Sequence, residues 1–399
     1  MSTQLQAPVW ARAEIFPAKP ISGVFGFQDT KGKRIAADSL KDLISLIKKS
    51  KNGIDLVWSP KDEHMVAPEE LSSLRPVLLK RRADWAHGDI ADGKKLSLIM
   101  GAAVVWSIYS AYANNQGDIR AVGNTPSVAI SAIMLLIFGL VPWYEGWKEL
   151  RKSSNRSDDY WQKEVDDARF DSWLGQQRSP FTFALLGLML VTGIAQWGAS
   201  GGVDWSSESL SKIALLKETV PGGDVWWRYL TAPLAHGNLV HWVMNFAGLR
   251  YLAKRTESLA RWPQMILVFI ISAFVGGMTT VYLAPSVPSV GASGGILGLL
   301  GFLLVFETLN KKLVPKTARK RLLAGLVMAG VMGVLGFSFI DNAAHAGGAI
   351  AGMVYAAIVF PLSSSVVRPD ILKRDLVAGA VALVVLTAAA IGCAMLVLG

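Results

Sequence analysis

The decisive stretch of this sequence reads Val290-Gly291-Ala292-Ser293-Gly294-Gly295-Ile296-Leu297-Gly298. It lies within a segment, Trp262 to Phe306, that contains no Asp, Glu, Lys or Arg. Because about 20 apolar residues are enough to cross a bilayer, this segment predicts two membrane spans. Proline cannot continue a helix, so the break is expected between Pro285 and Pro288. Ser293 should therefore begin the second span, near one membrane surface.

Ser293 can be interpreted in two ways. The flanking glycines let another chain approach closely, and the first N–H groups of a helix lack intrahelical partners, which suits a nucleophilic serine. Gly-x-Ser-Gly in a membrane helix is also a common packing device, because small residues let helices touch. Taken alone, the motif favours packing, so the rest of the chain has to decide.

The composition is that of a polytopic membrane protein. Of the 399 residues, 52% are hydrophobic, and the mean hydropathy is +0.37. The net charge of +10 comes from basic residues in short loops between apolar runs, which indicates membrane topology and argues against nucleic acid as a partner. The single cysteine, Cys393, excludes disulfides and cysteine-based metal sites, and we expect neither a metal nor a cofactor. No basic region precedes an apolar core at the N-terminus, so no cleaved signal peptide is expected.

Residues 1–95 are soluble in character and are expected to form a small cytoplasmic α/β module. Within it, hydrophobic periodicity and turn residues predict strands at 23–27 and 54–58 and helices at 39–48 and 67–74. Ser39 is the expected N-cap of the first helix.

Nine apolar runs follow, at approximately 97–113, 126–144, 180–198, 236–253, 263–284, 292–309, 322–340, 344–361 and 375–398. The connecting loops alternate between strongly basic and nearly uncharged. By the positive-inside rule, the N-terminus is expected in the cytoplasm and the C-terminus outside it. A longer outward loop, 199–235, is rich in tryptophan and is expected to dip into the headgroup region. We expect a multi-pass protein of a bacterial inner membrane, with the lipid bilayer as its surroundings.

Several chemically active side chains fall near the outward ends of these runs: Ser293, His345, and the group His236, His241 and Asn245. A lone membrane histidine is often a packing residue, but a serine, histidines and an amide at one depth are hard to attribute to chance. An imidazole can take the serine proton and return it to a leaving amine. His241 and Asn245 are four residues apart, so they share a helical face and can direct N–H donors at a developing oxyanion.

Two pairs of glycines are placed to bring the serine and the histidine together. Gly294 with Gly298, and Gly348 with Gly352, form small-xxx-small pairs on the two runs that begin with Ser293 and His345. Asp341 lies four residues before His345 in a tight outer turn, and we interpret it as a helix N-cap rather than a third catalytic residue.

Over roughly residues 180–361, the sequence resembles the rhomboid intramembrane serine proteases. The resemblance rests on Gly-x-Ser-Gly at Gly291–Gly294, Ala-His-x-Gly-Gly at Ala344–Gly348, His-x4-His-x3-Asn at His236–Asn245, and Trp227-Arg228. It implies a Ser293–His345 dyad, an oxyanion site from the Ser293 backbone N–H with His241 and Asn245, and a membrane-dipping first loop held partly by Arg228. The glycines Gly291, Gly294 and Gly348, and His236, would support this site.

The resemblance also implies a six-span core at 180–361 and an extra C-terminal span at 362–399. The small α/β module at 1–95, the two additional spans at 96–145 and the cytoplasmic basic linker at 146–179 are not part of that core, and the expected fold class is an all-α polytopic membrane protein with a small soluble module. One departure concerns Leu297. Family members often have an aromatic residue there, under the histidine ring, whereas leucine supplies an apolar floor without ring stacking.

The expected function is cleavage of transmembrane segments of membrane-anchored proteins near the extracytoplasmic side. The alternative is a non-proteolytic protein of the same fold that binds transmembrane clients. A transporter should show Gly- or Pro-broken helices at corresponding positions of two halves, and the sequence has no such internal repeat. Transmembrane proteins are thus the expected partners in both remaining hypotheses.

Overall fold

The computed structural model describes residues 7–21, 23–152, 157–202, 205, 207–216, 226–284, 288–337 and 339–399. The chain forms two compact units, one of Met1–Gln176 with Ala329–Ile340 and the other of Gln177–Met328 with Asp341–Gly399. Pro285, at the predicted break between two spans, and residues 217–225 of the predicted outward loop lie outside the described residues.

The first unit begins with a three-stranded antiparallel sheet of order β2-β1-β3. Its elements are β1 (Phe25–Asp29), β2 (Arg34–Ala37), α1 (Leu40–Lys49) and β3 (Ile54–Trp58). Leu43 and Ile47 of α1 are buried against Phe27 and Val57 of the sheet, and Ser39 caps α1 by accepting a bond from the Asp42 N–H at 3.1 Å. The predicted helix and the strand at 54–58 are confirmed.

Two local predictions for this module were incomplete. The strand β2 was not predicted, because Arg34–Ala37 is only four residues long and shows no clear alternation of apolar and polar residues. It pairs antiparallel with β1, and Ile35 and Ala37 pack in the core of this module. The segment 67–74 forms two single 3-10 turns, η3 (Pro68–Glu70) and η4 (Ser72–Leu74), instead of one helix. Pro68 is the first residue of η3. Its ring fixes φ and prevents a helix from continuing toward the N-terminus, so a turn begins at this residue.

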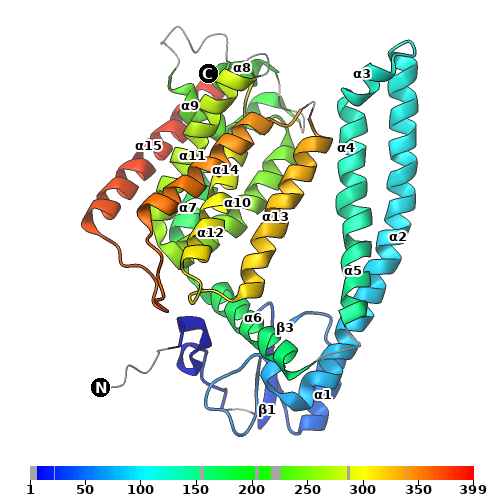
Figure 1. The fold of residues 1–399 in the computed structure, drawn as a ribbon, viewed down its shortest axis with the longest axis vertical. Helices are drawn as coiled ribbons and strands as arrows, with labels where there is room; N and C mark the ends of the chain where they lie inside the picture. The colour runs from blue at the N-terminus through cyan, green and yellow to red at the C-terminus, as the bar shows by residue number, and fades with distance from the viewer. Residues whose placement is uncertain are drawn as a thin grey trace. The chain divides into compact units, whose positions relative to one another are not determined.

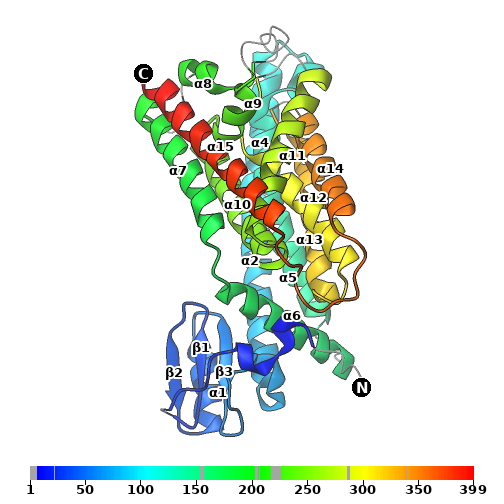
Figure 2. The same cartoon turned by 90° about the vertical axis from the view of Figure 1, so that its left-hand side faces the viewer.

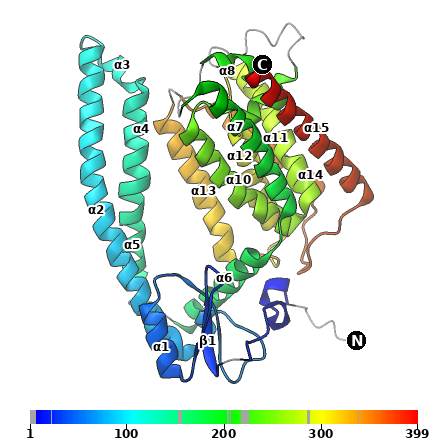
Figure 3. The same ribbon diagram turned by 180° about the vertical axis from the view of Figure 1, so that it is seen from behind.

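A long helical hairpin completes the first unit (Figure 3). It comprises α2 (Arg75–Asn114), α3 (Ile119–Gly123), α4 (Pro126–Met134), the π-helical turn η5 (Leu135–Leu140) and α5 (Val141–Lys152), and the helix α6 (Asp158–Gln176) follows it in the chain. Glycines allow close approach: a Cβ added to Gly93 of α2 would lie 2.7 Å from the backbone nitrogen of Trp143. The stretch expected as a linker, 146–179, consists mostly of the end of α5 and of α6.

The second unit is a helix bundle (Figure 1). Its elements are α7 (Pro180–Ser200), α8 (Ser207–Ile213), α9 (Arg228–Thr231), η7 (Ala232–Leu234), α10 (Leu239–Ala260), α11 (Trp262–Leu283), α12 (Ser293–Leu309), α13 (Lys316–Leu335, whose last residues belong to the first unit), α14 (Asn342–Val359) and α15 (Lys373–Leu398). Each of the nine predicted apolar runs overlaps a helix, with the second divided among α4, η5 and α5. The runs 236–253 and 322–340 extend beyond their helices, because α10 begins at Leu239 and α13 ends at Leu335.

Six helices of the described chain are long and apolar enough to cross a membrane, and α12 is a shorter apolar helix. The six segments are Ser72–Asn114, Pro126–Arg151, Pro180–Ser200, Trp262–Leu283, Asn342–Val359 and Lys373–Leu398. α10 is less apolar than its predicted run, because it extends to Ala260 and includes four charged residues, Arg250, Lys254, Arg255 and Glu257. The chain is an integral multi-pass membrane protein with a small N-terminal sheet, as the sequence predicted.

Buried charges fix the helix ends of this bundle that lie away from Ser293. Arg255 and Glu307, each 1% exposed, form a bidentate pair, Nε to Oε1 at 2.7 Å and Nη2 to Oε2 at 2.9 Å. Glu257 accepts bonds from the Thr182 backbone N–H at 2.7 Å and hydroxyl at 2.6 Å. These bonds join α10 to α12 and α10 to the start of α7, and a charge left buried without its partner would be costly.

Candidate active site

α12 begins at Ser293 because the chain turns sharply at Gly291. Gly291 has φ +116°, a conformation that side chains disfavour, and its N–H donates to the Ala232 carbonyl at 2.9 Å. A Cβ at this position would lie 2.8 Å from Cε1 of His241. Glycine is therefore required here for its backbone angle and for the space it leaves.

Ser293 and His345 are hydrogen-bonded, with the His345 Nε2 atom 2.7 Å from the Ser293 Oγ atom. His345 lies in the first turn of α14, and Asp341 caps that turn by accepting the Ala344 N–H at 3.0 Å. The predicted cap is confirmed. The bond leaves the hydroxyl proton within reach of an imidazole base, which is the first requirement for a nucleophilic serine.

Glycine contacts between α12 and α14 set the distance between these two residues. A Cβ on Gly348 would lie 2.1 Å from the Gly294 carbonyl oxygen, and one on Gly352 would lie 1.9 Å from the Gly298 oxygen. Real Cβ atoms do not approach an oxygen so closely, so any side chain at either position would separate the helices. The predicted small-residue packing of these two helices is confirmed.

His241 and Asn245 lie on α10. The point where a Gly291 Cβ would sit is 2.9 Å from His241 Nε2 and 3.9 Å from Ser293 Oγ, so both side chains lie close to the turn at Gly291. Asn245 is buried, and its amide donates to the His241 carbonyl at 2.9 Å. An amide nitrogen has two protons, so one donor of Asn245 remains for another acceptor.

His236 precedes α10 rather than lying on it, contrary to the predicted run that began there. The helix starts at Leu239, and its cap, Asn238, accepts the His241 N–H at 2.8 Å. The His236 ring is fully buried and packs edge-on against His241 with the ring centres 5.2 Å apart. Its ring thus packs beside that of His241, and in the part of the chain that the structure describes it makes no hydrogen bond to Ser293.

Gln196 is a residue of this site that the sequence reasoning missed. It is fully buried on α7, accepts the His236 N–H at 3.0 Å and donates to the His236 carbonyl at 2.9 Å. Both backbone groups of the turn before α10 are satisfied in this way. A glutamine inside an otherwise apolar run was the available signal.

Arg228 holds the first loop of the bundle together. Its Nη1 atom donates to the carbonyls of Ser211 at 2.9 Å and Ala214 at 2.6 Å, and its guanidinium lies 4.8 Å from the centre of the Trp227 ring. Partial burial lowers the pKa of Arg228, but an arginine remains charged at neutral pH.

A second missed residue, Ser289, connects the serine loop to the histidine helix. Its hydroxyl donates to Asp341 Oδ2 at 2.6 Å, and its backbone pairs with Leu215 through bonds of 3.0 and 3.1 Å. Ser289 and Asp341 lie in different loops, so their spacing in the sequence did not predict this bond. Leu297, one turn after the serine, is half-buried.

The polar groups of this site are the hydroxyl, the imidazoles, the amide and the backbone N–H groups at the start of α12. Among the residues that the structure describes, no three His, Cys, Asp or Glu side chains cluster so that they could hold a metal ion.

Comparison with known proteins bears on this geometry. The family model described as Rhomboid domain matches residues 223–362, which include Ser293, His345, His241 and Asn245. Residues 223–362 thus form a rhomboid domain within this chain.

The rhomboid relatives differ in what their names say of activity. RHOMBOID-like protein 6, mitochondrial, of Arabidopsis thaliana is 32% identical over 157 residues, 39% of this chain and 50% of that protein. Rhomboid protease GluP of Bacillus subtilis (strain 168) is 28% identical over 160 residues, 39% of this chain and 30% of that protein. Inactive rhomboid protein 2 of Homo sapiens is 28% identical over 167 residues, 41% of this chain and 19% of that protein. The chain thus spans half or less of each relative.

Proposed function

We propose that this rhomboid protein is an intramembrane serine endopeptidase that cleaves transmembrane segments of membrane-anchored proteins near the extracytoplasmic side. The observation that carries the proposal is the 2.7 Å contact between His345 Nε2 and Ser293 Oγ, made between two helices of a membrane bundle. A structural serine has no need of an imidazole at its oxygen. A nucleophilic serine does, because its hydroxyl is weak until a base takes the proton.

The steps follow from the positions of the polar groups. Ser293 Oγ attacks the scissile carbonyl carbon while His345 takes its proton, and the imidazolium then gives that proton to the leaving amine. Water, deprotonated by His345, releases the acyl group and restores the serine. The developing oxyanion would meet the unpaired N–H at the start of α12, with His241 and the second amide proton of Asn245 beside it.

The side of the membrane is inferred from charge. The basic loops assign the N-terminus to the cytoplasm and the start of α12 to the extracytoplasmic surface. Substrates would then be transmembrane proteins that present their outer segment to Ser293, and the bilayer would align enzyme and substrate.

The proposal is tested with a fluorophosphonate probe on the purified full chain. We expect wild-type protein to be labelled, and Ser293→Ala and His345→Ala each to abolish labelling and peptide cleavage with little change in thermal unfolding temperature. Because the two residues act as one unit, the double variant should be hardly worse than either single variant. Losses that multiply in the double variant would contradict a dyad.

The second candidate is a non-proteolytic rhomboid that binds transmembrane clients. The similarity to a protein named Inactive rhomboid protein 2 favours it. Well-folded wild-type protein that never labels, or labels equally without Ser293, would support client binding and overturn the protease proposal.

A further inference from the structure

We propose that the C-terminal helix α15 is a positioning element of the active site, and that Cys393 and Val397 hold the loop before Ser293 and the turn before α10 in place. The proposal rests on the proposed proteolytic function. It concerns residues outside the matched rhomboid domain, which ends at residue 362.

α15 has one buried face along its whole length. The buried residues are Gly379, Ala382, Leu386, Ala390, Cys393 and Val397, which recur every three or four positions as expected for one side of a helix. This face packs on α7 and α11 and reaches α8 and α9 at its C-terminal end (Figure 2). The other faces carry exposed apolar residues such as Met395, 69% exposed, which suit a lipid surface.

The last two turns of α15 reach the site itself. Cys393 and Val397 form a buried cluster with Ala195, Ile213 and Ala235, and Val290 packs against it. Val290 directly precedes Gly291 and the turn into α12, and Ala235 directly precedes His236. The cluster thus touches the two backbone segments from which the serine and the His241 helix begin.

A shift of the Val290 segment would reach the catalytic base as well. Ser289, the preceding residue, bonds to Asp341 Oδ2 at 2.6 Å, and Asp341 caps the helix of His345 at 3.0 Å. Contiguous bonds of this kind join the α15 cluster to both members of the proposed dyad. The path from Ser289 to α14 consists of two hydrogen bonds that share Asp341, one from the Ser289 hydroxyl and one from the Ala344 N–H.

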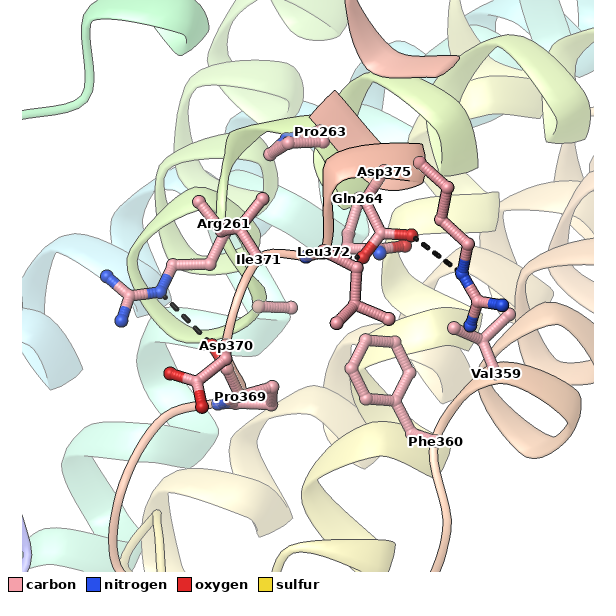
Figure 4. A pocket seen from close by; sticks show the side chains of 12 residues that line it. Arg261, Pro263, Gln264, Val359, Phe360, Pro369, Asp370, Ile371, Leu372 and Asp375 are labelled. Carbon is pink, nitrogen blue, oxygen red and sulfur yellow. Dashed lines mark hydrogen bonds and ion pairs between the residues drawn. The ribbon is translucent and has the colours of Figure 1, made fainter. Parts of the chain in front are cut away.

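The N-terminal end of α15 and the segment before it are held by contacts with α10 and α11, so the helix can transmit a displacement along its length. Figure 4 shows the pocket at its base, where Arg261 Nε donates to the Pro369 carbonyl at 3.3 Å. Arg368 Nη1 donates to the Ser258 carbonyl at 2.9 Å. A Cβ on Gly379 would lie 2.7 Å from Cβ of Pro263, so the first turns of α15 lie directly against α11. Displacement at the tip cannot be relieved easily by sliding the helix.

The test places a phenylalanine in the cluster and compares it with a phenylalanine placed toward lipid in the same turn. Cys393→Phe should lower kcat on a model substrate at least about tenfold with KM within about twofold, since an ångström of misplacement at a reacting group is enough for such a loss. The control, Met395→Phe, lies in the same turn but faces outward and should leave both constants within about twofold. Equal effects of the two variants, or an unchanged kcat in folded Cys393→Phe, would overturn the proposal.

A compensating substitution distinguishes positioning from general damage. Val290 packs against the cluster that contains Cys393. Val290→Ala in the Cys393→Phe background therefore makes room beside the cluster and should recover part of kcat. If Cys393→Phe does not fold, Val397→Ala removes two methyl groups from the same cluster and should lower kcat several-fold at unchanged KM. Absence of recovery in the first case, or of any effect in the second, would contradict positioning by α15.

A packing measurement separates this proposal from the proposed function. Cys393 is the sole cysteine, so intact mass after maleimide treatment reports its exposure alone. We expect slow alkylation in the wild type and faster alkylation in Val290→Ala, whether or not the enzyme is active. Equal alkylation rates in the two proteins would refute the packing of Val290 against the Cys393 cluster, even in an active enzyme. If the alkylation rates are as expected but the fluorophosphonate probe does not label the wild type, only the protease proposal is refuted.

Discussion

Asp341 accepts two hydrogen bonds that join the loop before Ser293 to the helix of His345. One oxygen binds the Ala344 N–H of α14, and the other binds the Ser289 hydroxyl. Neither bond requires a negative charge, because the oxygen of an asparagine could accept the Ala344 N–H while its amide nitrogen donates to the Ser289 hydroxyl oxygen. Both bonds of Asp341 are thus structural contacts.

Replacement of Asp341 distinguishes these roles. Asp341→Asn should keep kcat within about threefold, because asparagine is an equally good N-cap. Asp341→Ala should lower kcat about tenfold and cost roughly 1 kcal/mol of stability, as cap removal usually does. Steady-state kinetics and thermal unfolding of the two variants decide the matter. An asparagine variant as impaired as the alanine variant would mean that the charge of Asp341 acts on His345.

At the scale of the elements, local patterns in the sequence predicted helices better than they predicted their ends. Ser39, the apolar spacing of α1 and the charge-free runs were sufficient, since each depends on neighbours in sequence. The start of α10 at Leu239, after His236, depends on Gln196 from another helix. The Ser289–Asp341 bond and the α15 cluster likewise join distant segments, and no periodicity carries that information.

The α12–α14 contact is the element interface on which catalysis should depend most. Gly348→Ala places a Cβ 2.1 Å from the Gly294 oxygen, and the helices must separate to accept it. We expect a loss of about 1–3 kcal/mol of stability, typical of overpacking, and loss of most fluorophosphonate labelling, because His345 would move from Ser293. Gly187→Ala on α7 is the matched control, since a Cβ there has nothing within 4 Å. Normal labelling of Gly348→Ala would contradict this dependence.

At the scale of the whole molecule, the second unit separates its chemistry from its structural charges along α12. Ser293 is the first residue of that helix, and Glu307, buried with Arg255, is near its last. Seventeen residues span about 25 Å at 1.5 Å per residue. Ser293 and the buried ion pair therefore lie toward opposite ends of α12, and a substrate that reaches Ser293 does so near one end of the helix only.

This depth predicts where a substrate is cut. The carbonyls of a transmembrane helix are already hydrogen-bonded, and unpaired backbone groups in lipid cost several kcal/mol each. Cleavage should thus occur near the outer end of the segment, after a small residue such as alanine and close to a Gly or Pro that weakens the helix. Moving a Gly-Pro pair to the cytoplasmic end of a model substrate should abolish cleavage, with product masses reporting the position. A unique cut at the cytoplasmic end would instead mean that Ser293 faces the other surface, because no peptide bond 25 Å away can reach its hydroxyl without the whole helix unwinding.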